Sequence, residues 1–194
     1  MILGLVLATV PGFSKTPLSD VRITVLLYDY VNLPADARVE ATANAKRVLG
    51  QAGVDVEFIE CYLGGIKTGR PGCTGPLGPA VLTLRICQPK FAEYGKQLGY
   101  AVMAPEGGAY ITMFINPAER RARVTSLSDG ALLGHTVAHE IGHLLLGANA
   151  HASGGIMRPV WRPCDEEWMA KGALQFDAGQ AKKMQATLLA RAGR

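Results

Sequence analysis

The stretch S-D-G-A-L-L-G-H-T-V-A-H-E-I-G-H-L-L-L-G, residues 128–147, predicts the helix around which the rest of the fold is arranged. Ser128, Asp129 and Gly130 are typical of a helix start, where short polar groups satisfy the backbone N–H groups of the first turn. The apolar residues that follow predict a helix over residues 131–146. Gly147 ends it, because glycine readily adopts the left-handed backbone found after helix C-termini.

Within this helix, His139 and His143 are four positions apart, and Glu140 follows the first of them. Residues i and i+4 lie on one face of a helix, so both imidazoles can reach one metal ion. Glu140 can then point towards a water molecule on the ion rather than towards the ion itself. The pattern predicts a zinc site; the alternative is a pair of hydrogen-bonded core histidines.

The third ligand of such a site must come from outside the motif, because a catalytic zinc usually has three protein ligands and one open position. We expect His151, since the chain can leave the helix at Gly147 and fold back beneath the ion. His135 shares the helix, but three histidines at i, i+4 and i+8 span about 12 Å, too far for one tetrahedral ion. We therefore give His135 a supporting or capping role. The alternative third ligands are acidic: Asp165, Glu166, Glu167 and Asp177.

Patterns over the rest of the chain predict a single α/β (α+β) domain. Runs rich in β-branched and aromatic residues predict strands at residues 20–30, 54–61, 80–87, 99–104 and 109–115. Apolar spacing predicts further helices at 34–49 and 177–190, while segments 63–79 and 148–166 are expected to be loops. Because a helix joins only one strand pair, we expect a twisted sheet of mixed direction with a backing, an active-site and a C-terminal helix.

The four cysteines show no C-x-x-C spacing of the kind used in metal or redox sites. We expect two disulfides, Cys61–Cys73 closing the glycine-rich loop and Cys87–Cys164 tying the sheet to the C-terminal segment. Buried thiols are the alternative.

An apolar run at residues 2–10 is too short to cross a bilayer, which needs roughly 20 residues. We interpret residues 1–19 as the remnant of a signal peptide; a first core strand or a frayed terminus is the alternative. Together with disulfides, an export signal favours a secreted or periplasmic protein.

Two motifs, H-E-I-G-H-L-L-L-G-A-N-A-H at 139–151 and G-I-M-R-P at 155–159, resemble the zinc-binding helix and Met-turn of the metzincin metallopeptidases, especially the matrixin-like branch. The resemblance implies that His139, His143 and His151 bind zinc and that Glu140 is the general base. It further implies that Met157 forms a hydrophobic floor under the metal.

The same resemblance implies that an edge strand pairs with extended substrate through Gly99, Tyr100, Ala101 and Val102. The chain departs from the family pattern H-E-x-x-H-x-x-G-x-x-H at two places. One extra residue precedes Gly147 and another precedes His151, which gives H-E-x-x-H-x-x-x-G-x-x-x-H.

The expected function is that of a zinc-dependent endopeptidase, a metalloendopeptidase with its catalytic domain at residues 20–194. Zinc would activate a water molecule, Glu140 would take its proton, and the substrate would be a polypeptide. We expect a monomer without a membrane span, and no nucleic-acid partner, because the net charge of +4 is small and its basic residues are scattered. The alternatives are a secreted zinc-stabilised binding module with four protein ligands and a zinc hydrolase of a non-peptide substrate.

Overall fold

The computed structural model describes residues 21–75, 77–88, 97–104, 108–116 and 127–193. The interpretation of residues 1–19 as a signal-peptide remnant falls outside these ranges. Within the described residues, no helix is both long enough and apolar enough to cross a membrane.

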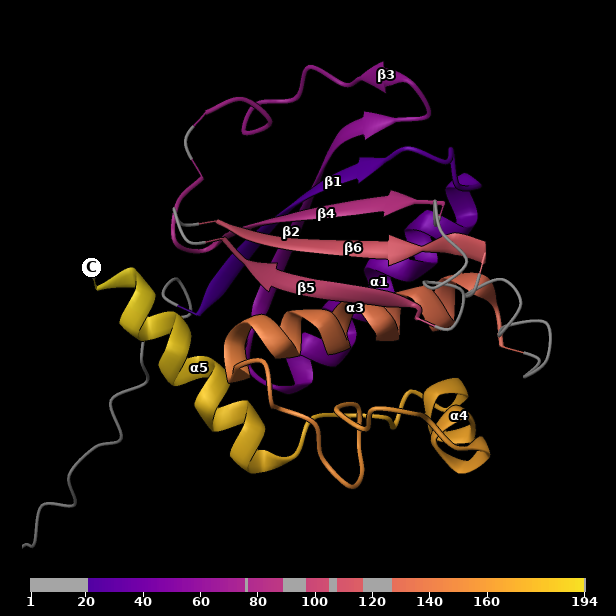
Figure 1. Ribbon diagram of the computed structural model, residues 1–194, viewed down its shortest axis with the longest axis vertical. Helices are drawn as coiled ribbons and strands as arrows, with labels where there is room; N and C mark the ends of the chain where they lie inside the picture. The colour runs from indigo at the N-terminus through magenta and orange to yellow at the C-terminus, as the bar shows by residue number, and fades with distance from the viewer. Residues whose placement is uncertain (1–20, 76, 89–96, 105–107, 117–126, 194) are drawn as a thin grey trace, which may run out of the picture.

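A mixed sheet forms one layer of the molecule, with strand order β3-β2-β1-β4-β6-β5. Strand β1 runs parallel to β2 and β4, and β4 runs parallel to β6, whereas β3 and β5 are antiparallel to their neighbours. The predicted mixed α/β sheet is therefore confirmed. In this order β5 is an edge strand, and it lies beside α3 (Figure 1). The strands are β1 (Arg22–Asp29), β2 (Asp55–Leu63), β3 (Ile66–Lys67), β4 (Val81–Cys87), β5 (Gly99–Met103) and β6 (Ala109–Phe114).

The helices of the described residues lie on one side of this sheet, with α1 and α3 against it and α4 and α5 beyond them (Figure 1). The apolar residues of α1 and α3 pack on the inner face of the sheet and form one continuous core with the segment that follows α3. The three helices predicted from the sequence are confirmed. The helices are α1 (Ala35–Gln51), α3 (Asp129–Leu146), α4 (Pro163–Ala170) and α5 (Ala178–Ala192).

Two glycines bring α3 close to α1. A Cβ on Gly130 would lie 2.5 Å from the Glu40 carboxylate, and one on Gly134 would collide with the carbonyl oxygen of Ala41. The hydroxyl of Ser128, the N-cap of α3, accepts a hydrogen bond from Ala131 N. It also donates one to Glu40 Oε1 at 2.6 Å, so α3 is fixed to α1 before its first turn.

The structure corrects the expected loop at residues 148–166, because α4 begins inside it at Pro163. Proline suits the first turn of a helix, where its missing N–H has no intrahelical partner. Asp165 completes the start by accepting a hydrogen bond from Arg162 N at 2.8 Å. The expected loop at 63–79 is also interrupted, by the short strand β3.

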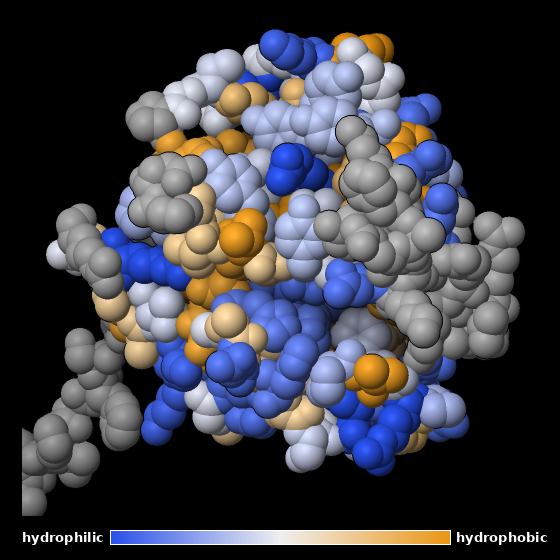
Figure 2. Space-filling model, viewed as in Figure 1, coloured by the Kyte–Doolittle hydropathy of each residue, from blue (hydrophilic) through white to orange (hydrophobic). Residues whose placement is uncertain are grey.

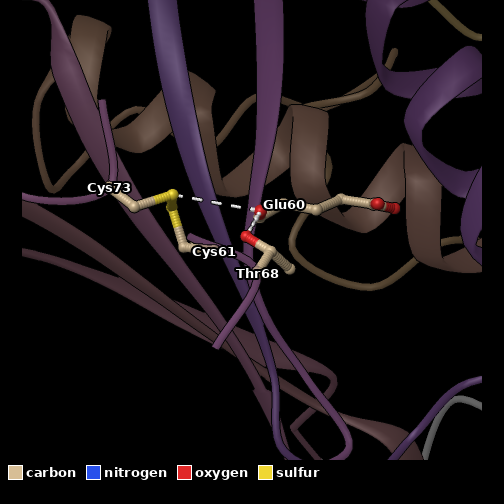
Figure 3. Close-up of a disulfide and its surroundings, with 4 residues drawn as sticks. All are labelled: Glu60, Cys61, Thr68 and Cys73. Atoms are coloured by element: carbon tan, nitrogen blue, oxygen red, sulfur yellow. Dashed lines mark hydrogen bonds between the residues drawn. A yellow bond between two sulfur atoms is a disulfide. The ribbon is translucent and has the colours of Figure 1, made fainter. Parts of the chain in front are cut away.

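The predicted disulfide Cys61–Cys73 is confirmed, with a Cα–Cα distance of 5.4 Å. Figure 3 shows it beside the Glu60 carbonyl oxygen, which accepts a hydrogen bond from the Thr68 hydroxyl, so bridge and hydrogen bond hold the loop to β2 together.

The predicted disulfide Cys87–Cys164 is wrong, since neither cysteine takes part in a disulfide. The Cys87 thiol donates to Met113 O at 3.8 Å, within the sheet. Cys164 is exposed in α4, a helix that lies beyond α3 from the sheet (Figure 1). The helix start at Pro163, which the sequence interpretation missed, is what places Cys164 there.

Candidate metal centre

Helix α3 presents His139 and His143 on one face, as their spacing predicts. The helix ends at Leu146, and Gly147 leaves it with a φ of 106°, a left-handed conformation that glycine adopts without strain. The chain then turns back and brings His151 to the same face. The turn at Gly147 therefore brings the loop residue His151 next to the two histidines of the helix.

The side-chain nitrogens of the three histidines converge. The His143 Nε2 atom lies 3.0 Å from His139 Nε2 and 3.2 Å from His151 Nε2. The three offer ligand atoms that all lie within 4.8 Å of one another, the arrangement of a group that can hold a metal ion. Burial falls from buried His139 through half-buried His143 to exposed His151, so the group opens to solvent on one side.

The donor set and spacing fit zinc. Three nitrogens bound to a tetrahedral zinc ion at 2.0–2.1 Å lie about 3.3 Å apart, close to the two Nε2 separations. Of the two additional residues of the 139–151 segment, one lengthens the end of α3, which runs to Leu146, and the other lies in the turn after Gly147. None of the four acidic alternatives belongs to the group in the described residues. Asp165 instead starts α4, and Asp177 accepts from Gln180 N at the start of α5.

His139 is held in the form that binds metals. Its Nδ1 lies 2.7 Å from the carbonyl oxygen of Ile156, which can only accept, so Nδ1 donates and Nε2 keeps its lone pair. Burial lowers the pKa of His139 to about 4, and burial with the neighbouring His151 also lowers the pKa of His143. Both imidazoles are therefore neutral near pH 7.

Glu140 is buried on α3, with 7% of its surface exposed. Burial raises its pKa to about 7. Strand β5 lies close by, since a Cβ on Gly99 would sit 3.6 Å from Glu140 Cγ. A carboxylate with a pKa near neutrality beside an edge strand is suited to exchanging protons with a molecule bound there.

The other predicted residues of β5 alternate along the strand. Ala101 shares the inward-facing side with Gly99 and is half-buried, whereas Tyr100 and Val102 are exposed on the other side. Figure 2 shows hydrophilic residues gathered at the centre of the face below this strand, with hydrophobic residues beside them. Polar and apolar surface thus adjoin where β5 borders α3.

Met157 is fully buried beneath α3. A Cβ on Gly142 would lie 2.5 Å from the Met157 sulfur and 2.9 Å from the Phe176 ring. The glycine between the two helix histidines therefore makes room for this packing. Sequence reasoning did not use Gly142, although a glycine inside a helix costs about 1 kcal/mol relative to alanine and so signals a packing role.

His135 lies outside the three-histidine group, as predicted. Its Nδ1 lies 2.7 Å from Ala131 O, and its Nε2 lies 3.1 Å from Arg47 of α1. Arg47 in turn donates to Gly172 O at 2.6 Å. His135 thus belongs to a buried polar link between α1, α3 and the C-terminal segment.

A largely buried ion pair between Arg158 and Asp165 was not predicted. Arg158 Nε lies 2.9 Å from Asp165 Oδ2, and the two side chains are 15% and 1% exposed. The pair joins the turn that carries Met157 to the start of α4. The position of Arg158 next to Met157 is the one signal in the sequence for this ion pair. The sequence does not show which acidic residue the arginine contacts.

No protein-family model matches the sequence, and no curated protein matches it. Among solved structures, the fold is similar to a zinc-dependent peptidase from Methanocorpusculum labreanum (strain Z), with a TM-score of 0.52, 15% identity, and coverage of 83% of this chain and 99% of that one. The GM1-bound form of the ECX AB5 holotoxin overlaps with a TM-score of 0.42, 13% identity, and coverage of 90% of this chain and 81% of that one. The first similarity shows a shared fold, and the second overlap is too loose to establish even that. Fold and histidine group together define a mixed α/β protein with a candidate helix-borne metal site.

Proposed function

We propose that the chain is a zinc-dependent endopeptidase of the metzincin type, with residues 20–194 as its catalytic domain. The observation that carries the proposal is the convergence of His139, His143 and His151 beside the buried carboxyl group of Glu140. The zinc-dependent peptidase of similar fold supports the same reaction class.

In this proposal the three Nε2 atoms would hold zinc, and the bound ion would lower the pKa of a coordinated water to about 7 and polarise the scissile carbonyl. Glu140 accepts a proton from the attacking water at a carboxylate oxygen. It then delivers that proton to the nitrogen of the leaving amine, so that its own protonation state is restored. Burial raises the pKa of Glu140 to about 7 in the metal-free chain, and a zinc ion beside it would favour the carboxylate form that accepts the proton.

The substrate we propose is an extended polypeptide bound along β5. An edge strand offers main-chain N–H and C=O groups to a further strand, and this mode recognises peptide backbone rather than particular side chains. Gly99 lies next to Glu140, since a Cβ there would be 3.6 Å from Glu140 Cγ, so a peptide paired with β5 has its backbone near the carboxylate. Met157 serves as the apolar floor beneath the helix histidines.

The two alternatives predict different sites. A zinc-stabilised binding module needs a fourth protein ligand, whereas the candidate group among the described residues consists of three histidines. A hydrolase of another substrate does not require a carboxylate at position 140. Three ligands and Glu140 therefore favour the peptidase. The Cys61–Cys73 disulfide is compatible with the secreted or periplasmic location that we propose for it.

The test compares cleavage of an unfolded polypeptide by zinc-loaded wild type and Glu140→Gln. We expect Glu140→Gln to lower the rate by about 10²–10⁴-fold, the usual contribution of a general base. Glu167→Gln, which changes an exposed acid of α4, is the matched control and should keep wild-type activity. Equal cleavage by wild type and Glu140→Gln would contradict the proposal.

A further inference from the structure

Trp161 contacts the same carbonyl group as the most buried histidine of the metal centre. Its Nε1 lies 3.1 Å from Ile156 O, and His139 Nδ1 lies 2.7 Å from that oxygen. We propose that Trp161 is a positioning residue for His139, acting through the Ile156 carbonyl and through its own ring. The inference rests on the proposed zinc site.

The backbone of Ile156 is held at both its N–H and its carbonyl group. Its N–H donates to Gln175 O at 3.0 Å, while its carbonyl accepts from the two side chains. The turn around it is closed by hydrogen bonds from Ala152 N to Met157 O and from Arg158 N to Gly155 O. The acceptor of the His139 proton therefore belongs to a rigid turn.

The indole N–H defines the direction of that carbonyl, because tryptophan can only donate a hydrogen bond. A carbonyl oxygen has two lone pairs, so it accepts from both rings at once. If the tryptophan donor is removed, the oxygen keeps His139 as the one remaining donor of the two, and its direction is less closely defined. The tautomer and angle of a metal-binding histidine depend on the hydrogen bond of its other ring nitrogen. Mutation of the partner in that hydrogen bond typically weakens metal binding by 10–100-fold.

The indole also restricts the imidazole directly. The two ring centroids are 5.8 Å apart and the planes meet at 89°, an edge-to-face arrangement. Trp161 is half-buried and packs against the main core, so it does not move easily. Rotation of the His139 ring about its Cβ–Cγ bond is therefore opposed from the Trp161 side.

The chain contains a matched control, because its second tryptophan, Trp168, is half-exposed in α4. Zinc affinity is measured by competition with a chromogenic chelator for wild type, Trp161→Phe and Trp168→Phe. Trp161→Phe keeps an aromatic ring but loses the N–H. We expect it to bind zinc about tenfold more weakly than wild type, the lower end of the 10–100-fold range, because the Ile156 carbonyl still accepts from His139. Trp168→Phe should stay within about twofold of wild type.

Tryptophan emission gives a second readout, because the Trp161 ring lies against His139 and should sense zinc bound there. Trp168→Phe leaves Trp161 as the one emitter, and its emission should change until one zinc per chain is bound. Trp161→Phe leaves only Trp168, whose emission should not respond. If Trp161→Phe does not fold, as judged by far-ultraviolet circular dichroism, the zinc titration of Trp168→Phe, followed by Trp161 emission, tests the inference instead.

The outcomes separate this inference from the proposed function. Wild type that takes up no zinc overturns both. Wild type that binds zinc, with equal affinity in Trp161→Phe or with no response of Trp161 emission, overturns the role of Trp161 alone.

Discussion

The Met157 sulfur lies directly under Gly142, at a position where a Cβ on that glycine would be only 2.5 Å away. Gly142 is the residue before His143 and two after Glu140, so any movement of this part of α3 displaces the metal centre. The buried Met157 side chain therefore fills the space that a side chain at position 142 would need.

Gly142→Ala should destabilise the chain and weaken zinc binding together. Overpacking of a tight core contact costs about 1–3 kcal/mol, which exceeds the gain of about 1 kcal/mol from helix propensity. Thermal or urea unfolding of the metal-free chain measures the loss of folding stability. Gly50→Ala in α1 is the control, since a Cβ there meets nothing within 4 Å. A Gly142→Ala variant as stable as Gly50→Ala would contradict the packing argument.

His151→Ala should weaken zinc binding by more than about 100-fold, the upper end of what residues outside the ligand set contribute. His151 is exposed, so the free energy of unfolding of the metal-free chain should change by no more than about 0.5 kcal/mol. Isothermal titration with zinc and urea unfolding give the two quantities. Retention of wild-type zinc affinity would exclude His151 as the third ligand.

His135→Gln should lower the folding stability but leave zinc binding intact. It removes buried hydrogen-bonding groups that contact Ala131 and Arg47, at a cost of roughly 1–3 kcal/mol of folding stability. Zinc should still bind with a stoichiometry of one. Loss of zinc binding in a folded His135→Gln chain would show that this histidine takes part in the site.

Asp165→Asn should lower the free energy of unfolding by about 3 kcal/mol, because it leaves Arg158 partly buried without its carboxylate. Glu167→Gln, two positions further along α4 and exposed, should change it by less than about 0.5 kcal/mol. Urea unfolding of both variants checks the difference. Equal stabilities would mean that the pair contributes nothing to holding the turn.

The pH dependence of folding should carry the signature of Glu140. Burial raises its pKa from 4.5 to about 7 in the folded chain, so between these values the folded state holds a proton that the unfolded state has lost. Stability from this group is complete below pH 4.5 and is lost as pH rises through 7, by on the order of 3 kcal/mol. In metal-free urea unfolding, Glu140→Gln should remove this decline. A wild-type and Glu140→Gln difference that stays constant across this range would contradict it.

The sequence predicted those parts of the fold that depend on local patterns. Helix α3 has a cap at Ser128, an apolar run and a stop at Gly147, so its bounds follow from residues within it. Its histidines share a face for the same reason, and the return of His151 follows from the glycine. The mixed sheet follows from the order of strand and helix signals.

The remaining features depend on contacts between distant residues. An even number of cysteines suggests a pair between Cys87 and Cys164, but α4 holds Cys164 away from the sheet. Pro163 alone is typical of a loop, but together with Asp165 it begins helix α4. Sequence spacing gives no distance between Trp161 and His139, which the turn around Ile156 brings together.

An anomalous difference map at the zinc absorption edge, from crystals of the zinc-loaded chain, tests the central claim most directly. We predict one peak, at 2.0–2.1 Å from the Nε2 atoms of His139, His143 and His151, with no other protein atom as a ligand. A peak elsewhere would contradict it, and so would a fourth protein ligand on the same ion.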